Sequence, residues 1–309
     1  MEPALSVKPA ILALPLLLAS CAIPIQKTPP QIERLPAPLS LAGPAWAAQC
    51  EDWDEWNKPA PPVRLHGNSY LVGTCGIAAI LVTGSKGHVL IDGGTADGAA
   101  LIAANIRALG FRLEDVRLIL HSHEHDDHVG GVAALQKMTG ARLYASPVAA
   151  KVFETGAASG DDPQAGMQPP FPAARVDQIV KDGDVVRLGD LALKAHATPG
   201  HTSGALSWSW TACEAGCLSI VYADSLSPVS RDDYRFLDHP EGVAAFRRSI
   251  ARVGALDCDV LTTPHPSASR MRDWLKAGAL PLTGRDCATY ATGLSERLDK
   301  RLAKEEAGQ

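Results

Sequence analysis

Apolar positions along the chain recur with two different spacings. Residues 70–73, 78–82 and 88–91 are short apolar runs separated by turn-forming residues, which predicts a meander of three strands. Residues 96–109 instead repeat apolar side chains three or four positions apart and precede a glycine, which predicts a helix. The apolar run at 118–120 then predicts a buried strand.

The same criteria predict further elements up to the C-terminus. The expected strands are 142–145, 184–186, 191–193, 205–211, 218–222 and 260–261, and the expected helices are 132–139, 242–253 and 286–303. Residues 156–175 are rich in glycine, proline and aspartate and have no periodicity. A loop of that length is usually functional or disordered, so we expect a flap beside the functional site.

Four candidate metal ligands follow the strand at 118–120. His123 and His125 are two residues apart, so in extended backbone their side chains project to the same side and can reach one ion. Asp127 and His128 come where the chain must turn, and they can reach a neighbouring position. Histidine nitrogen and carboxylate oxygen both suit zinc. A charged, solvated turn is the alternative, but it leaves this concentration of imidazoles and carboxylates unexplained.

The stretch His123-Glu124-His125-Asp126-Asp127-His128 matches the pattern H-x-H-x-D-H, and on this motif the chain resembles the metallo-β-lactamase superfamily. The resemblance implies an α+β fold, a four-layer αββα sandwich, as a single domain over residues 50–309. The motif alone does not identify the substrate. Lactonases, glyoxalase II-type thioesterases and RNA-processing nucleases of the superfamily carry it too.

Two further histidines complete the ligand set that the resemblance implies. His201 lies in Gly-His-Thr-Ser-Gly at 200–204, which matches the family motif G-H-T-x-G, and His265 lies between two prolines after a short strand. The implied ligands of the first zinc are His123, His125 and His201, and those of the second zinc are Asp127, His128 and His265. Asp127 is also the implied catalytic residue, because it can orient a hydroxide shared by the two ions.

The stretch Ala-Asp-Ser-Leu-Ser at 223–227 distinguishes branches of the superfamily. Zinc β-lactamases of class B, subclass 3, typically carry this sequence, and the resemblance implies that Ser225 and Ser227 hydrogen-bond the substrate carboxylate. If Asp224 were turned toward the ions as a bridging carboxylate, a lactonase or thioesterase would follow instead. We interpret His121 and His196 as structural or supporting histidines.

The resulting hypothesis is a zinc-dependent β-lactamase, in which a zinc-bound hydroxide hydrolyses the lactam amide of penicillins, cephalosporins and carbapenems. The alternatives are a dinuclear zinc lactonase or thioesterase and, from another class, a metal-binding surface lipoprotein without catalysis. The expected partner is a small-molecule β-lactam bound by a monomer. A net charge of −5 without a basic stripe argues against nucleic acid as a partner.

Residues 1–20 resemble an export signal, because an apolar run too short to span a bilayer follows Lys8. The run ends in Leu-Ala-Ser-Cys at 18–21, which is similar to a bacterial lipobox, so Cys21 is the candidate for lipidation. Residues 21–49 are rich in proline and are expected to form an extended tether. We therefore expect a periplasmic protein, either anchored to a bacterial membrane by lipid or released by cleavage near residues 45–47.

Seven cysteines is an odd number for an exported protein, and lipidation of Cys21 leaves six. Six cysteines allow fifteen pairings, and the alternative is that several are free buried thiols. We favour disulfides between sequence neighbours, as in some exported metallo-β-lactamases. The favoured pairs are Cys50 with Cys75, Cys213 with Cys217, and Cys258 with Cys287.

Overall fold

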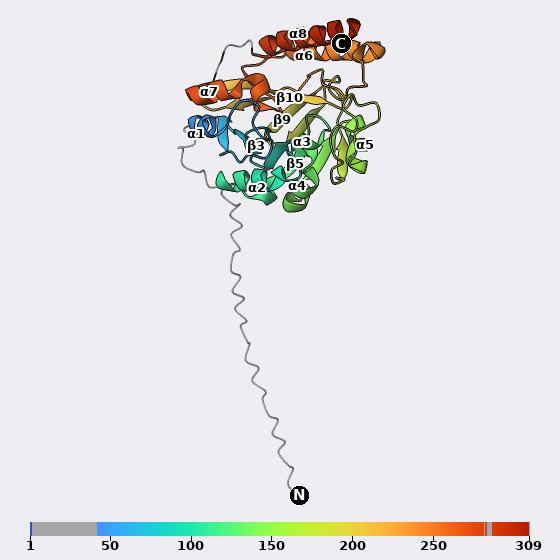
Figure 1. Cartoon of the computed structure of the whole chain (residues 1–309). Helices are drawn as coiled ribbons and strands as arrows, with labels where there is room; N and C mark the ends of the chain where they lie inside the picture. The colour runs from blue at the N-terminus through green and yellow to red at the C-terminus, as the bar shows by residue number, and fades with distance from the viewer. Residues whose placement is uncertain (2–41, 281, 283–285, 309) are drawn as a thin grey trace. The chain divides into compact units, whose positions relative to one another are not determined.

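The computed structural model describes residue 1, residues 42–280, residue 282 and residues 286–308. Two β-sheets lie face to face, with helices on their outer sides (Figure 1). The strands of the first sheet follow chain order: β1 (Val63–His66), β2 (Ser69–Leu71), β3 (Ile80–Gly84), β4 (Gly87–Ile91), β5 (Val116–Leu120), β6 (Arg142–Ala145) and β7 (Val176–Ile179). Strands β2 to β4 form the predicted antiparallel meander, and β1, which was not predicted, pairs antiparallel with β2. Strands β4 to β7 are parallel.

The second sheet has five strands in the order β12, β11, β10, β9, β8. Their bounds are β8 (Val185–Leu188), β9 (Leu191–Ala197), β10 (Leu206–Cys213), β11 (Cys217–Tyr222) and β12 (Val260–Thr262). The pairs are antiparallel except for β11 with β12, which are parallel. The carboxyl ends of β5, β9, β11 and β12 lead into the segments that carry the candidate site residues.

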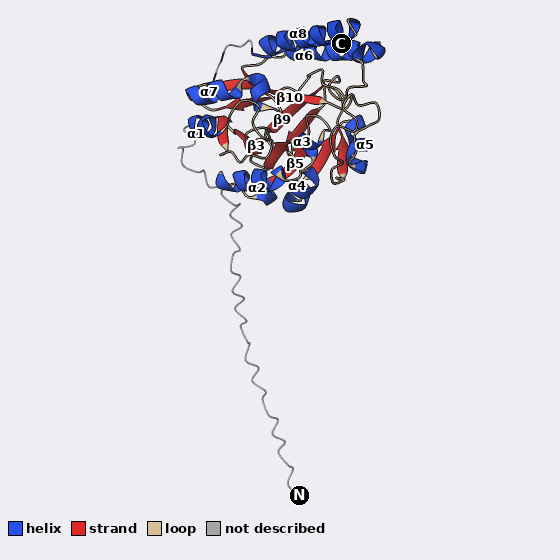
Figure 2. Ribbon diagram, in the orientation of Figure 1, coloured by secondary structure: helices blue, strands red, loops and turns tan. Residues whose placement is uncertain are grey.

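Helices form the two outer layers (Figure 2). The helices on the first sheet are α2 (Gly98–Ala108), α4 (Val132–Thr139) and α5 (Pro147–Thr155), and those on the second sheet are α6 (Pro240–Gly254) and α8 (Asp286–Glu306). The layer order is the αββα sandwich expected from the resemblance. Helix α5 and strand β7 were not predicted from the sequence pattern. Within the described ranges, no helix has both the length and the apolar character that crossing a membrane requires.

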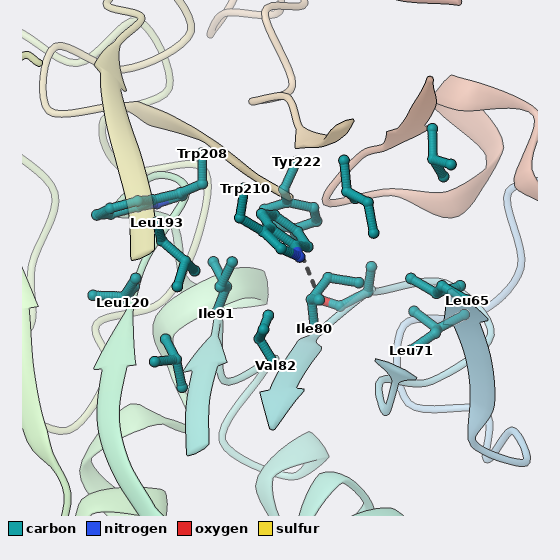
Figure 3. Close-up of a cluster of buried hydrophobic side chains, with 14 of the residues drawn as sticks. Leu65, Leu71, Ile80, Val82, Ile91, Leu120, Leu193, Trp208, Trp210 and Tyr222 are labelled. Atoms are coloured by element: carbon teal, nitrogen blue, oxygen red, sulfur yellow. Dashed lines mark hydrogen bonds between the residues drawn. The ribbon is translucent and has the colours of Figure 1, made fainter. Parts of the chain in front are cut away.

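Strand β3 shows why the fold needs a helical layer as well as a second sheet. Successive side chains of a strand point to opposite faces. Ile80 and Val82 therefore pack between the sheets, whereas Leu81 packs under the helices of the first sheet. The second sheet fills the inner layer with large aromatic side chains, among them Trp208 and Tyr222 (Figure 3). A strand that is apolar on both faces can be buried only in such a layered fold.

Residues 42–49 differ from the sequence prediction, which placed them in the tether 21–49. They form α1 (Ala42–Gln49), which packs against α7 (Met271–Ala277) and buries Trp46. One indole removes enough apolar surface from water to fix a short helix in a proline-rich context. The folded domain therefore includes residues from 42 onward, rather than from 50. Apart from residue 1, the predicted signal at 1–20 and the tether from 21 to 41 lie outside the described residues.

Three disulfides join the six cysteines of the described chain in the pairing favoured by sequence proximity. Cys50–Cys75 links the end of α1 to the segment before β3, and Cys213–Cys217 closes the hairpin of β10 and β11. Cys258–Cys287 links the segment before β12 to the start of α8. Such crosslinks restrict the unfolded chain and thereby favour the folded state.

Helix α8 allows a test of the outer layer. Leu294 is fully buried in the cluster formed with α6, so Leu294→Ala leaves a cavity. We expect the free energy of unfolding, measured by denaturant titration, to fall by about 2–5 kcal/mol. Glu296→Ala, on the exposed side of the same helix, is the control and should change it by less than about 0.5 kcal/mol. Equal effects of the two substitutions would contradict this packing.

Candidate metal centre

The chain leaves β5 in an extended conformation, which continues to His125 with φ −86° and ψ 151°. The side chains of His123 and His125 therefore project to the same side. Helix α3 (Asp126–Val129) begins directly afterwards and carries Asp127 and His128. The Gly93 N–H donates to the carbonyl of His128 at 2.8 Å, which fixes this turn against the end of β4.

The second sheet contributes two more histidines. His201 lies in the loop after β9, and His265 follows β12. The loop of His201 passes very close to α6, since a Cβ built on Gly200 would lie 2.6 Å from the ring of Phe246. Glycine at this position lets the backbone reach the site without a clash.

Six side chains that the sequence predicted as ligands lie together: His123, His125, Asp127, His128, His201 and His265. In each of two groups the possible ligand atoms lie within 4.8 Å of one another, and the groups are His123–His125–His201 and His123–Asp127–His128. His265 Nε2 lies 3.4 Å from Asp127 Oδ2, beside the second group. The predicted residues from three separate turns therefore meet at one place.

Two carboxylates orient the imidazoles that leave β5. His123 donates from Nδ1 to Asp224 Oδ1 at 2.7 Å, which leaves its Nε2 free. His125 donates from Nε2 to Asp162 Oδ2 at 2.9 Å, which leaves its Nδ1 free. A carboxylate on one ring nitrogen fixes the tautomer and makes the other nitrogen a better metal ligand.

Backbone carbonyls orient the other two histidines. His201 donates from Nδ1 to the carbonyl of Ser227 at 2.9 Å, and His265 donates from Nδ1 to the carbonyl of Gly76 at 3.2 Å. In both rings Nε2 is the nitrogen left for the cluster. The second-sheet histidines thus present the same atom to the site from different loops.

The protonation state of the cluster suits a cation. Burial, reinforced by the neighbouring imidazoles, lowers the pKa of His123 well below its usual value and that of His201 to about 3. Burial alone would raise the pKa of Asp127, but the neighbouring histidines, His128 first among them, together outweigh burial and hold this pKa well below the usual range. Burial alone would lower the pKa of His125, but the carboxylate to which it is hydrogen-bonded raises it. The neutral imidazoles of His123 and His201 and the ionised carboxylate of Asp127 are the forms that bind metal.

Several buried atoms of the cluster have no hydrogen-bond partner among the described residues. They are Nε2 of His123, Oδ1 of Asp127 and Nδ1 of His128, whereas Nε2 of His128 lies 3.0 Å from Asp127 Oδ2. Leaving buried polar atoms unpaired costs about 1–3 kcal/mol each, so such a concentration calls for a ligand. Imidazole nitrogen and carboxylate oxygen are the donor set of zinc, and the residues present therefore fit a metal.

The Ala-Asp-Ser-Leu-Ser stretch also lies beside the cluster. Asp224 lies behind His123 and belongs to neither of the two converging groups, which argues against a bridging role. The hydroxyl of Ser225 is buried and has no hydrogen-bond partner in the part of the chain that the structure describes, which leaves it available to a ligand. Ser227 approaches His201 through its carbonyl at 2.9 Å and its hydroxyl at 3.4 Å, a supporting contact that the sequence did not reveal.

The flap predicted at 156–175 runs from the end of α5 to the start of β7 and reaches the cluster. Besides Asp162, its Gln164 places Nε2 at 3.3 Å from Nε2 of His201. Arg231 fixes the backbone of the flap, because its guanidinium donates to the Asp162 carbonyl at 2.9 Å. Sequence reasoning predicted a flap here but identified neither side chain, since nothing in a loop without periodicity marks such contacts.

Two exposed tryptophans lie beside His265, and sequence reasoning assigned them no role. The ring centres of Trp53 and Trp56 are 6.0 and 6.5 Å from that of His265.

The two histidines predicted to be structural, His121 and His196, form hydrogen bonds outside the cluster. Nε2 of His121 accepts from the Ser146 N–H, and Nε2 of His196 contacts the Ser209 hydroxyl. Their hydrogen bonds agree with structural roles.

Residues 62–214 match the family described as the metallo-beta-lactamase superfamily. The solved structure of the MIM-2 metallo-beta-lactamase is 57% identical, with a TM-score of 0.82, over 85% of this chain and 98% of that one. The chain belongs to the metallo-β-lactamase superfamily.

Within this superfamily the chain resembles the subclass B3 enzymes over their full length. MEM-A1, a subclass B3 metallo-β-lactamase from a soil metagenome library, is 43% identical with a TM-score of 0.78, over 82% of this chain and 100% of that one. The hydroxyacylglutathione hydrolase of Rhodopseudomonas palustris is 37% identical over 113 residues, or 36% of this chain and 34% of that protein. The chain therefore matches only about a third of that curated relative.

The contact between Asp162 and His125 can be tested by metal affinity. Asp162→Ala removes the acceptor that orients His125, and we expect zinc binding, measured by chelator competition, to weaken about 10- to 100-fold. Asp161→Ala is the matched control, because Asp161 is the exposed neighbour and hydrogen-bonds Ser159 instead. Equal zinc affinities of the two variants would show that the flap carboxylate does not support the metal centre.

Proposed function

We propose that the protein is a zinc-dependent β-lactamase that hydrolyses the lactam amide of penicillins, cephalosporins and carbapenems. The observation that carries this proposal is the position of Asp224 behind His123, within the Ala-Asp-Ser-Leu-Ser stretch. A bridging carboxylate there would favour a thioesterase or lactonase. The full-length likeness to solved β-lactamases supports the same choice, because the match to the hydroxyacylglutathione hydrolase is partial.

The residues support a centre of two zinc ions. The ligands that we assign to the first ion are His123, His125 and His201, and those for the second are Asp127, His128 and His265. Zinc held by these residues would supply a water of near-neutral pKa and positive charge opposite the lactam carbonyl and the departing nitrogen. The chain contains neither S-x-x-K nor G-x-S-x-G, the motifs of common serine nucleophiles.

In this mechanism Asp127 orients the attacking water, and Ser225 and Ser227 orient the substrate. Asp127 Oδ1 has no partner among the described residues, so it can accept a hydrogen bond from the attacking water and orient it toward the carbonyl carbon. The free hydroxyl of Ser225 can donate to the carboxylate that β-lactams carry beside the ring, with Ser227 next to it. A C–O bond forms, the ring C–N bond breaks, and the nitrogen takes up the proton released by water.

A substrate panel tests the proposal. Purified protein with zinc is mixed separately with a carbapenem, a cephalosporin, a homoserine lactone and a thioester, with and without chelator. We expect turnover of the two β-lactams that chelator abolishes and added zinc restores. Chelator-sensitive turnover of only the lactone or the thioester would replace the β-lactamase by the alternative hydrolase.

Two variants control this panel. Asp127→Asn should lower kcat by about 10²- to 10⁴-fold, because a neutral amide is a weaker hydrogen-bond acceptor for the water and a weaker metal ligand than a carboxylate. Such a loss excludes turnover by a contaminating enzyme. His66→Ala should retain wild-type turnover, because His66 contacts the carbonyl of Gly216 at the β10–β11 hairpin. Equal losses in the two variants would mean that the assay reports folding rather than the site.

We also propose that the protein is exported to the periplasm and anchored through a lipid on Cys21. The lipobox-like sequence at 18–21 supports this, and three disulfides are typical of an oxidising compartment. A membrane-anchored domain needs a tether, and the proline-rich residues between Cys21 and α1 could provide one.

Mass spectrometry of the mature protein from the membrane fraction tests the anchor. We expect a new N-terminus at Cys21 that carries acyl chains, and Cys21→Ser should move the protein to the soluble periplasmic fraction. An unmodified N-terminus beyond Cys21 in the wild-type protein would contradict lipidation and favour ordinary signal cleavage.

A further inference from the structure

Glu124 lies between His123 and His125 but faces the other way, as alternation in extended backbone requires. Its carboxylate is 2% exposed and reaches the ligand loop that follows β9. Oε2 accepts from the Thr202 hydroxyl at 2.8 Å, and Oε1 accepts from the Gly204 N–H at 2.9 Å. A single side chain thus joins two ligand-bearing turns that are 78 to 80 residues apart in the chain.

The fit between the carboxylate and the loop is close. A Cβ built on Gly204 would lie 2.6 and 2.8 Å from the two oxygens of Glu124, so the loop backbone rests directly on the carboxylate. At the start of β10, directly after the loop, the Leu206 N–H donates to the carbonyl of Ser122 at 2.6 Å. Of these hydrogen bonds, the one from Thr202 lies nearest to His201, because Thr202 is the next residue in the chain.

We propose that Glu124 is a positioning residue, which holds His201 at a fixed separation from His123 and His125 and thereby sets the geometry of the first metal site. The inference rests on the metal-binding role in the proposed function. Both partners of the carboxyl group are donors, and each of its two oxygens accepts one of these hydrogen bonds. An imidazole that arrives on a loop needs such a support, since its own loop has no regular structure to orient it.

Three substitutions separate this role from general stability. Glu124→Ala removes both bonds. Glu124→Gln keeps an acceptor for the Gly204 N–H, and its amide can donate to the Thr202 hydroxyl, so it should restore the spacing. Glu305→Gln is the matched control: Glu305 is also buried and accepts from the backbone N–H groups of two residues at η3 (Phe236–Asp238), in the packing of α8.

The measurements are zinc affinity by competition with a chromophoric chelator, the visible spectrum of the cobalt-substituted protein, and the midpoint of thermal unfolding. We expect Glu124→Ala to weaken zinc binding about 10- to 100-fold and to change the cobalt spectrum, which reports ligand geometry. Glu124→Gln should stay within about threefold of wild type. Glu305→Gln should lower the unfolding midpoint but leave zinc affinity and spectrum unchanged.

Two results would overturn the proposal: unchanged zinc affinity in Glu124→Ala, or a parallel loss of affinity and stability in Glu305→Gln. If Glu124→Ala does not fold, Thr202→Val removes one of the two bonds and should weaken zinc binding in the same direction by a smaller factor. None of these measurements uses a β-lactam. A protein that hydrolyses no β-lactam but loses zinc in Glu124→Ala would therefore contradict the proposed function and leave this inference intact.

Discussion

A buried imidazole binds a metal best when the protein holds one ring nitrogen and leaves the other for the ion. In this chain that arrangement is found at four of the five histidines of the site, all except His128. His123 and His125 are held by carboxylates from distant segments, and His201 is held by a backbone carbonyl. Each hydrogen bond fixes which nitrogen faces the cluster. The candidate metal centre therefore depends on contacts made outside it as much as on its own members.

Those contacts require the two sheets to keep a constant spacing. Asp92, after β4, accepts from the hydroxyl of Tyr222 on β11 at 2.7 Å and from both N–H and hydroxyl of Ser122 after β5. Trp208 on β10 donates to the carbonyl of His121 at 2.8 Å. The aromatic layer between the sheets thus continues directly into the turn that bears the histidines. The packing of the core and the geometry of the site therefore depend on the same hydrogen bonds.

The sequence predicted the members of the site better than their supports. His123, His125, Asp127 and His128 could be found because local spacing reveals them, and His201 and His265 because they lie in recognisable surroundings. Asp162 could not be found, since its contact with His125 spans 37 residues and its loop has no period. The orientation of the Asp224 side chain could not be predicted either, because the stretch Ala-Asp-Ser-Leu-Ser is compatible with a carboxylate that points toward the ions or away from them.

The helices and strands likewise divide into those that the sequence pattern predicted and those that it did not. Helices with a clear apolar stripe, such as α4 and α6, lie where the pattern predicted them. Helix α1 was missed because Pro44 continues the series of prolines that precedes it. Its stability depends on burying Trp46 against a distant helix and on the disulfide that follows it at Cys50. Local pattern therefore predicts elements that bury a stripe of side chains, and fails for those held by contacts with distant segments.

The contact between the flap and His125 has a kinetic consequence. Asp162 holds a ring that faces the cluster, and Arg231 fastens the backbone of the same residue. Any movement of the flap would therefore take the supporting carboxylate away from one predicted ligand. Escape of a bound ion would then be coupled to opening of the loop, and the residence time of the ion would depend on a surface segment as well as on the coordinating atoms.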